Sequence, residues 1–263
     1  MKTLKNLLLK TIGTKNYLLL VSKLFFILYQ SNLLKLFRSF DCHYFVAKLV
    51  KKGDTVIDIG ANLGYYSKLA AKLVGDQGKV YSVEPVKDYL DVLKVNLNNT
   101  KNTTILPFAL GESDGKEIVM GIASEDTYRH GLTKVFSQEE IDNKNYKVRY
   151  NVLMRDPVKL FDEISKIDYI KCDIEGYETY VITAIVDILK KHKPTLQIEI
   201  WNQYREFLVG FLINIGYKAF VVSKDDLLAY DSESASDIIF IHETKLDQFK
   251  SISSKKMQDY FYS

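Results

Sequence analysis

The sequence predicts an α/β protein with a mostly parallel sheet and helices on both of its faces. From about residue 41 onward, short runs rich in β-branched residues alternate with segments of helical period, which is the order expected of parallel strands joined by crossover helices. The run 54–59 suits a strand covered on both faces, because Val56, Ile57 and Ile59 are all β-branched. It leads into a glycine-bearing turn and then into a helix that starts at about Gly64.

The further elements follow from the apolar period and from helix-breaking residues. The helix at 87–97 places its large apolar residues on one face, and the helix at 178–190 ends in lysines before Pro194. Two more helices are expected at 43–52 and 205–215. The other expected strands are 79–84, 103–107, 118–120, 148–154, 167–172, 195–201, 218–222 and 236–242.

Length and composition indicate one sheet domain with additions at both ends. The expected parts are a basic, apolar helical extension at 1–42, the sheet domain at 43–245 with a β-rich insertion at 111–155, and a tail at 246–263. Cys42 and Cys172 lie far apart in the sequence and lack metal-ligand spacing. We therefore expect reduced thiols and a cytoplasmic protein.

The charge of the chain is unevenly distributed. Residues 1–40 hold seven lysines and arginines and no acidic residue, so the net charge of +3 for the whole chain leaves −4 for residues 41–263. A mildly acidic body of this kind indicates no nucleic-acid groove.

The N-terminal segment is also rich in large apolar residues. Its run 17–29 is shorter than the ~20 residues that a transmembrane helix needs, and no small-residue cleavage site follows it. We expect a pair of helices that packs on the domain or forms a contact in a homo-oligomer. The alternative is an amphipathic helix through which residues 1–38 contact anionic lipid at the inner membrane surface.

The turn after the first strand predicts the kind of ligand. Its pattern, Asp58-x-Gly60-x-Asn62-x-Gly64, lacks the third glycine of the dinucleotide fingerprint. The carboxylate of Asp58 would repel a pyrophosphate, whereas a ligand with a cationic or hydroxyl-rich part would fit beside it. The turn therefore favours S-adenosylmethionine (SAM), which carries an ammonium and a sulfonium. An NAD-type oxidoreductase is the alternative.

Acidic side chains follow two neighbouring strands of the expected sheet. Glu84 comes 24 residues after Gly60, about where an acid holds ribose hydroxyls in Rossmann-like sites. Asp173 and Glu175 come directly after a buried strand and flank the start of a turn at Gly176. Such a pair of carboxylates can orient an ammonium, act as a base or bind a divalent ion.

An alcohol acceptor would need a general base within hydrogen-bond reach. The candidates for catalysis are Asp173, Glu175 and His130. A divalent cation held by Asp173, Glu175 and Glu199 is an alternative that the sequence leaves open but does not favour. Trp201 and Tyr204 could form a wall for a sugar, but large aromatic residues at a strand end favour a place in the core.

Four motifs resemble a known family in their order and approximate spacing. They are VIDIGANLGYYS at 56–67, EP at 84–85, FALG at 108–111 and IKCDIEGYE at 170–178. Together they are similar to the successive motifs of the FkbM-type SAM-dependent methyltransferases, over roughly residues 43–201. The chain differs from the family pattern at His43, where Glu is frequent, and at 155–157, where Arg-Asp-Pro replaces a Thr-Leu-Asp run.

The resemblance implies a Rossmann-like methyltransferase sheet of seven strands with the last one antiparallel, and methyl transfer from SAM, usually to a hydroxyl oxygen. The residues that it implies for SAM binding are Asp58, Gly60, Asn62, Gly64, Tyr65, Glu84, Ala109 and Asp173. Within this set, Glu84 would hold the ribose and the backbone at Ala109 would border the adenine. Asp173 would face the ammonium or the acceptor.

We therefore expect O-methylation of a hydroxyl on a sugar, glycan or related metabolite. A further alternative is a catalytically silent protein that kept the fold and uses its basic N-terminal segment to organise a membrane assembly. The acceptor contacts are expected in the insertion at 111–155.

Overall fold

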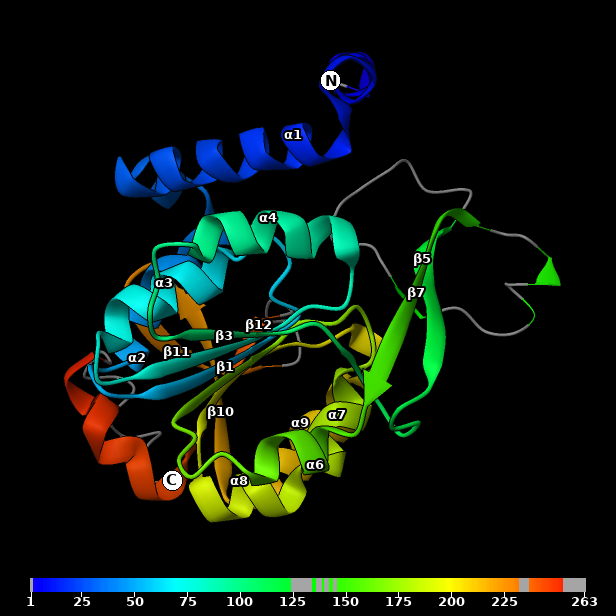
Figure 1. Cartoon of the computed structure of the whole chain (residues 1–263). Helices are drawn as coiled ribbons and strands as arrows, with labels where there is room; N and C mark the ends of the chain where they lie inside the picture. The colour runs from blue at the N-terminus through cyan, green and yellow to red at the C-terminus, as the bar shows by residue number, and fades with distance from the viewer. Residues whose placement is uncertain are drawn as a thin grey trace.

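A computed structural model describes residues 2–123, 134–135, 139, 142–143, 146–231 and 237–252. Its centre is an eight-stranded sheet in the order β11-β10-β12-β9-β8-β1-β2-β3 (Figure 1). The strands are β1 (Thr55–Ile59), β2 (Lys79–Val83), β3 (Thr103–Leu106), β8 (Tyr169–Cys172), β9 (Thr195–Glu199), β10 (Tyr217–Ser223), β11 (Asp226–Ala229) and β12 (Asp237–His242).

The strand directions confirm the predicted fold. β3, β2, β1, β8 and β9 are parallel neighbours, whereas β12, the last strand of this sheet along the chain, runs antiparallel between β9 and β10. The sheet has one strand more than expected, because β11 pairs with β10 in an edge hairpin. The hairpin turn contains Lys224 at φ 55°, and without a glycine or proline it has no strong turn signal in the sequence.

Helices cover both faces of the sheet (Figure 1). One layer contains α2 (Asp41–Leu49), α3 (Tyr65–Val74) and α4 (Lys87–Leu97), and the other contains α6 (Pro157–Asp162), α7 (Glu178–Ala184), α8 (Val186–His192) and α9 (Asn202–Asn214). The expected helix 178–190 is thus two helices. They meet at the buried Ile185 (φ −89°, ψ 21°), across which the hydrogen bonds to Val181 and from Leu189 continue.

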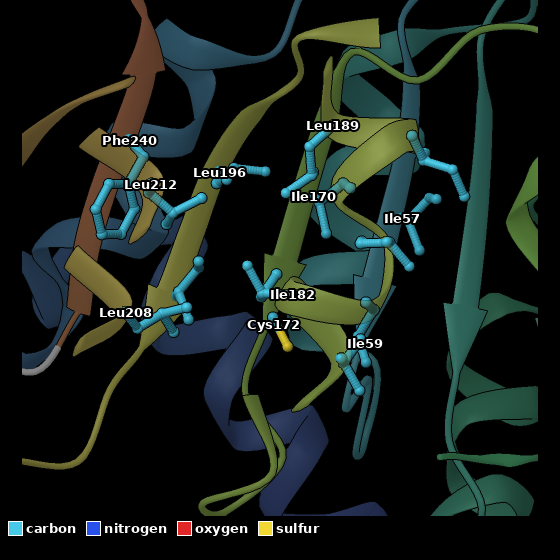
Figure 2. Close-up of a cluster of buried hydrophobic side chains, with 14 of the residues drawn as sticks. Ile57, Ile59, Ile170, Cys172, Ile182, Leu189, Leu196, Leu208, Leu212 and Phe240 are labelled. Carbon is cyan, nitrogen blue, oxygen red and sulfur yellow. The ribbon is translucent and has the colours of Figure 1, made fainter. Parts of the chain in front are cut away.

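The main hydrophobic core lies between the sheet and the layer of α6 to α9. Figure 2 shows Ile57, Ile59 and Ile170 from the strands against Ile182 and Leu212 from the helices. These strand residues sit on one face, since alternate side chains of a strand point the same way. The packing fixes the carboxyl ends of β1 and β8 next to each other, where the ligand crevice of an open α/β sheet forms.

The N-terminal segment forms α1 (Lys2–Gln30), interrupted at Gly13, whose φ of 76° and ψ of 164° are not helical. The part after Gly13 lies along α4 (Figure 1) and buries Leu18, Ser22 and Phe25. The helical segment after Gly13 therefore packs on the sheet domain. Two short 3₁₀ helices, η1 (Leu33–Leu36) and η2 (Arg38–Phe40), connect α1 to α2, and η3 (Glu243–Ile252) follows β12.

Within the described chain, the stretch Leu7–Gln30 of α1, 24 residues, is long and apolar enough to cross a membrane by length and composition, with 17% of its most apolar window buried. It is longer than the expected run 17–29, but the non-helical backbone at Gly13 divides it. Whether the extension contacts a membrane stays a prediction.

A smaller sheet rises beside the carboxyl ends of the central strands (Figure 1). It has the order β4-β7-β5-β6 and consists of β4 (Ala109–Leu110), β5 (Glu117–Ala123), β6 (Lys134–Val135) and β7 (Tyr146–Arg155). β5 and β7 form an antiparallel ladder, and β4 joins it parallel to β7. The insertion is thus β-rich, with strands longer than the expected 118–120 and 148–154.

Candidate functional site

The turn after β1 is held by the backbones of two neighbouring strands. The amides of Gly60 and Ala61 both donate to the carbonyl of Val83, at 3.0 and 2.9 Å, and the amide of Asp173 donates to the carbonyl of Ile59 at 3.0 Å. Gly60 has a φ of 81°, and a Cβ placed there would come within 1.8 Å of the Asp173 carbonyl oxygen. Only glycine fits at this position, because the backbones of two turns touch there.

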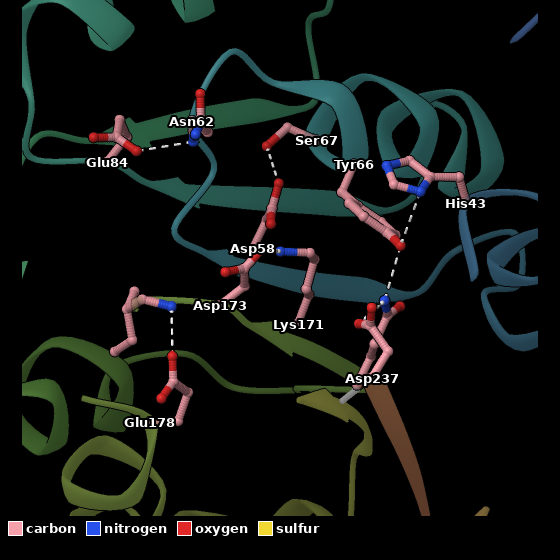
Figure 3. A network of polar contacts seen from close by, with 12 residues as sticks. His43, Asp58, Asn62, Tyr66, Ser67, Glu84, Lys171, Asp173, Glu178 and Asp237 are labelled. Carbon is pink, nitrogen blue, oxygen red and sulfur yellow. Dashed lines mark hydrogen bonds and ion pairs between the residues drawn. The ribbon is translucent and has the colours of Figure 1, made fainter. Parts of the chain in front are cut away.

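Asp58 lies buried beneath this turn. Its Oδ2 accepts a hydrogen bond of 2.6 Å from the Ser67 hydroxyl (Figure 3). The Ser67 hydroxyl in turn accepts one of 2.7 Å from Ser82. Oδ1 of Asp58 has no hydrogen-bond partner among the described residues, and the buried Oδ1 of Asn62 has none either. Burial raises the pKa of Asp58. Two buried acceptor atoms thus lack a donor, which is rare unless a ligand or water supplies one.

Glu84 links the turn after β1 to the backbone just before α4. One carboxylate oxygen accepts from the amide of Val86 and the other from the amide of Asn62, both at 2.8 Å, as Figure 3 shows for Asn62. Burial raises the pKa of Glu84 to about 7, although the two amides act in the opposite direction. Because each carboxylate oxygen can accept more than one hydrogen bond, both keep capacity for ribose hydroxyls.

Lys171 places a buried positive charge at the end of β8. Its ammonium lies 3.0 Å from Oδ2 of Asp173 and next to Asp58 in Figure 3, and the lysine side chain is 6% exposed. Burial acts to raise the pKa of Asp173, but the Lys171 ammonium outweighs it and holds that pKa below its usual value. Asp173 is therefore ionised at neutral pH.

The loop after Asp173 holds a strained acidic residue. Glu175 has a φ of 55°, in the left-handed region that a non-glycine residue rarely adopts. Glu178 fixes this loop, because its carboxylate accepts hydrogen bonds from the amides of Ile174 (2.8 Å) and Gly176 (3.0 Å). Burial, with the charges of Asp173 and Glu178, raises the pKa of Glu175 to about 7.

Glu199, at the end of β9, belongs to the same acidic cluster. Burial and the nearby Asp173 raise its pKa to about 8, and its carboxyl is hydrogen-bonded to that of Asp173. Since Lys171 favours the charge on Asp173, the proton of this pair stays on Glu199. The cluster therefore combines one stable anion with two carboxyls that gain or lose a proton near neutral pH.

Two adjoining cavities open at these strand ends. The first, of about 130 Å³, is lined by Gly60, Asn62, Glu84, Pro85, Tyr89, Met120, Asp173, Ile174, Glu175 and Glu199. The second, of about 40 Å³, is mainly apolar and is lined by Ile59, Gly60, Val83, Pro85, Phe108, Ala109, Leu110, Met120, Val135, Ile174 and Tyr177. They share four lining residues, so they form one crevice with a polar and an apolar half.

The structure brings most of the predicted site residues to this crevice. Gly60, Asn62, Glu84, Asp173 and Glu175 line the polar half. Ala109 lines the apolar half, and Asp58 lies beneath.

Two predicted residues, Gly64 and Tyr65, do not line the crevice as expected. Gly64 is the N-cap of α3, and a Cβ there would come within 2.6 Å of the Leu93 side chain. The Tyr65 ring points to α1, where its centroid is 4.0 Å from that of Phe25, so its assignment to SAM binding is not supported. His130 lies outside the described residues.

Two aromatic residues differ from their expected place in the core. Trp201 is 41% exposed and Tyr204 38%. The Trp201 ring lies against Gly176, where a Cβ would come within 3.3 Å of it. The prediction that they are core residues is wrong. α9 begins at Asn202, and the preceding Trp201 lies against Gly176, next to Glu175 of the crevice lining.

Sequence reasoning did not place Lys171 at the site, nor Asp237, whose charge adds to the rise of the Glu199 pKa, and it considered Glu199 only as a metal ligand. A lysine inside a buried strand was a usable signal, since lysines are almost never fully buried without a partner. Glu199 could have been found by the strand-end rule that located Glu84. Asp237 has no such signal, because it begins β12 and reaches this edge only through the antiparallel direction of that strand, where Gln197 donates to it at 3.1 Å.

The crevice fits SAM on observations of the structure itself. The unpartnered oxygens of Asp58 and Asn62 match a ligand that brings hydrogen-bond donors. Glu84 offers acceptors for the ribose, and the cavity beside Ala109 offers apolar walls for an adenine ring. In the described part of the chain no group of three or more His, Cys, Asp or Glu is placed to hold a metal ion, and the divalent cation stays a hypothesis.

A parallel sheet with an antiparallel last strand and an acidic glycine turn after β1 define the class of Rossmann-like SAM-dependent methyltransferases. The sequence profile of the methyltransferase FkbM domain matches residues 58–219, which is more than half of the chain. The chain belongs to the FkbM methyltransferase family. This membership removes the NAD-type oxidoreductase that the glycine turn alone left open.

Solved structures and characterised proteins are similar to the chain. Methyltransferase FkbM from Methylobacillus flagellatus KT aligns with a TM-score of 0.50 and 16% identity over 77% of this chain and 48% of that one. Fibrillarin from Aeropyrum pernix with natively bound SAM aligns with a TM-score of 0.42 and 12% identity over 73% and 68%. A protein-L-isoaspartate O-methyltransferase of Methanococcoides burtonii is 34% identical over 59 residues, which are 22% of this chain and 29% of that protein. The chain thus matches less than a third of that relative's length.

Proposed function

We propose that this methyltransferase transfers the methyl group of SAM to a hydroxyl oxygen of a sugar, glycan or related metabolite. The observation that carries the proposal is Glu175, a carboxyl with a pKa of about 7 in the polar half of the crevice. A base with this pKa is matched to the removal of a hydroxyl proton at neutral pH.

The donor side is recognised by fixed polar atoms. When bound, SAM supplies a methyl group on a positively charged sulfur that is open to displacement. The oxygens of Asp58 and Asn62 that lack partners would accept from its ammonium, and Glu84 from its ribose hydroxyls. Burial of these groups excludes water, which strengthens each interaction.

The part of the crevice that would bind the acceptor contains the proposed base and the polar side chains around it. Glu175 would take the proton of the acceptor hydroxyl as the methyl group is transferred. The ionised Asp173 beside it helps to raise the pKa of Glu175 and thereby its basicity. Asp173 and Glu199 offer hydrogen bonds to neighbouring hydroxyls, and the exposed face of Trp201 suits the apolar face of a sugar ring.

The test separates donor binding from transfer. Isothermal titration with S-adenosylhomocysteine should show binding in the micromolar range, and Asp58→Ala should abolish it. Labelled SAM should then be incubated with sugar, glycan and small hydroxyl-bearing acceptors, and the product examined by NMR. A new O–CH₃ group is expected.

Three outcomes would contradict this proposal. Absence of S-adenosylhomocysteine binding by the folded protein contradicts the donor site. Transfer only to an amine or a carboxyl contradicts the hydroxyl acceptor. Binding without transfer to any acceptor favours instead the catalytically silent protein that kept the fold.

A further inference from the structure

The outer face of α1 carries a strip of large apolar side chains. Leu20, Leu24 and Ile27 are 49%, 52% and 62% exposed. Because successive helical residues are about 100° apart, these three lie opposite Leu18, Ser22 and Phe25, which are buried against the domain. We call Leu20, Leu24 and Ile27 the outer strip. Packing within the described chain therefore leaves this strip uncovered.

We propose that the outer strip and the basic residues around it dock the protein on an anionic membrane surface. This inference does not depend on the identity of the methyl acceptor. Docking through α1 would hold the whole protein at the membrane, because the opposite face of α1 packs on the sheet domain.

Charge complementarity indicates a lipid partner. Residues 1–40 contain seven basic and no acidic residues. Lys10, Lys15, Lys23, Lys35 and Arg38 are all exposed. Apolar side chains interspersed with cations and free of acids are the composition of helices that lie in the interface of anionic membranes.

The exposed apolar surface continues beyond α1. Leu33, Leu36 and Phe37, in and after η1, are 50%, 78% and 58% exposed. These residues directly follow the helix in the chain and alternate with Lys35 and Arg38. The proposed docking surface therefore extends through η1.

A groove beside α1 also combines apolar walls with basic side chains. Its volume is about 560 Å³, and it lies between Phe26 and Tyr29 of α1, α3 and the loop after α4. Three lysines, Lys68, Lys72 and Lys101, line it together with one acidic residue, Asp76. A groove with apolar walls and a surplus of cations suits the phosphate headgroup of a lipid.

Two other occupants of this surface fit less well. A second copy of the chain, packed symmetrically through the same face, would bring two segments of seven positive charges together without a single acid. A membrane-spanning arrangement would remove Leu18, Ser22 and Phe25 from their buried places. It would also break the contact of 4.0 Å between the ring centroids of Phe25 and Tyr65.

The first experiment tests the outer strip in the full-length protein. Co-sedimentation should be measured with vesicles of phosphatidylglycerol and phosphatidylcholine, and with vesicles of phosphatidylcholine alone. The wild type should bind the anionic vesicles, and added salt should weaken this binding. The triple variant Leu20→Gln, Leu24→Gln, Ile27→Gln should lower the partition coefficient at least roughly tenfold. Phe207→Gln with Ile213→Gln, equally exposed on α9, is the matched control and should bind like the wild type.

The second experiment tests the charges. Lys10→Gln with Lys23→Gln should lower binding to anionic vesicles by roughly fivefold per lysine. The same change at Lys190 and Lys191, exposed at the end of α8, should leave it unchanged. Thermal melting and S-adenosylhomocysteine binding of each variant show that it is folded.

Each of the remaining outcomes overturns the proposal. One is a wild type that does not bind anionic vesicles, or a triple variant that binds as well as the wild type. A second is a dimer in light scattering that the triple variant converts to a monomer, which assigns the face to a second copy. A third is protein that stays in the vesicles after a high-salt and alkaline wash, which assigns α1 to a membrane span.

Discussion

The two turns that form the crevice are built on different physical principles. The turn after β1 depends on backbone geometry. Gly60 has a positive φ, the Val83 carbonyl accepts hydrogen bonds from two amides of the turn, and the Glu84 carboxylate accepts from two further amides. The turn after β8 depends on charge: the buried Lys171 pairs with Asp173, and Asp173 raises the pKa of Glu175 and that of Glu199 at the end of β9. A methyl donor is the same in every turnover and can be recognised by fixed atoms. Proton removal needs a group whose charge changes near neutral pH, and crowding produces such a group.

The largest effect is expected at the backbone contact. In Gly60→Ala, the new Cβ would collide with the Asp173 carbonyl, so we expect loss of S-adenosylhomocysteine binding and destabilisation by about 3 kcal/mol. Gly210→Ala is the control, because a Cβ there meets nothing within 4 Å. Calorimetric titration and thermal melting measure both. Wild-type affinity and stability in Gly60→Ala would show that the two turns do not need this contact.

The charged turn is tested by Glu175→Gln. Loss of the base should lower kcat by roughly 10² to 10⁴, while the affinity for S-adenosylhomocysteine stays close to that of the wild type. In the wild type kcat/KM should rise with pH through about 7, as Glu175 loses its proton, and the variant should lack this rise. Glu163→Gln, outside the crevice, is the control. A variant within tenfold of the wild type, with the pH profile retained, would assign the base to another residue.

Two lysine–aspartate pairs with the same spacing compare a buried with an exposed charge. Lys171 is 3.0 Å from Asp173 with a side chain 6% exposed, and Lys166 is 2.9 Å from Asp168 with a side chain 58% exposed. Lys171→Met should cost about 3–5 kcal/mol, because it leaves buried carboxylates unpaired, whereas Lys166→Met should cost about 0–1 kcal/mol. Denaturant unfolding measures both. Equal costs would mean that Lys171 does not stabilise the acidic cluster.

The raised pKa values predict the pH dependence of stability. Burial raises the pKa of Glu84 and Glu175 to about 7 and of Glu199 to about 8, so above pH 6.5 the folded protein binds more protons than the unfolded chain. Stability without ligand should therefore fall between pH 6.5 and about 8.5. His43, whose pKa is lowered by burial to about 3, acts in the opposite direction only below that window.

Melting temperatures across this window provide the measurement. The decrease should be smaller in a variant with Glu175→Gln and Glu199→Gln, because two of the three titrating carboxyls are then absent. A melting temperature that rises from pH 6.5 to 8.5 would contradict the crowding of these carboxyls.

The smallest effect is expected at the rim. Trp201→Ala removes the exposed ring beside Gly176, so KM for the acceptor should rise roughly threefold to tenfold, with kcat little changed. Phe207→Ala, exposed on α9, is the control. Steady-state kinetics with the acceptor identified by the screen measures the change. An unaltered KM would remove Trp201 from the acceptor side.

The parts of the site that depend on local chemistry could be predicted from the sequence. The turn 58–64 and Glu84 are specified by glycine spacing and by position after a strand, and the structure places Gly60, Asn62 and Glu84 around one cavity. The parallel sheet is likewise predicted from a sequence pattern, the alternation of strand and helix segments. Each of these features depends on residues within about 25 positions of one another.

The remainder depends on how distant segments meet. Asp237 reaches the acidic cluster through the direction of β12, and Met120 and Val135 reach the crevice through the small sheet. A large aromatic residue at a strand end is usually buried, which predicts a core place for Trp201, but here it comes just before the start of α9. The resemblance implies SAM binding by Tyr65, whereas its ring packs against Phe25 of α1.

The contact between Gly60 and the carbonyl of Asp173 has a consequence for how the family can diversify. The backbone path at residue 173 cannot shift toward β1, since no space separates the two turns. On the proposed function, new acceptor preferences would therefore arise through the side chains of Ile174 and Glu175, through Trp201, and through the small sheet that contributes Met120. An engineer who wishes to graft an acceptor loop from a relative should transplant the side chains and retain the main chain of both turns.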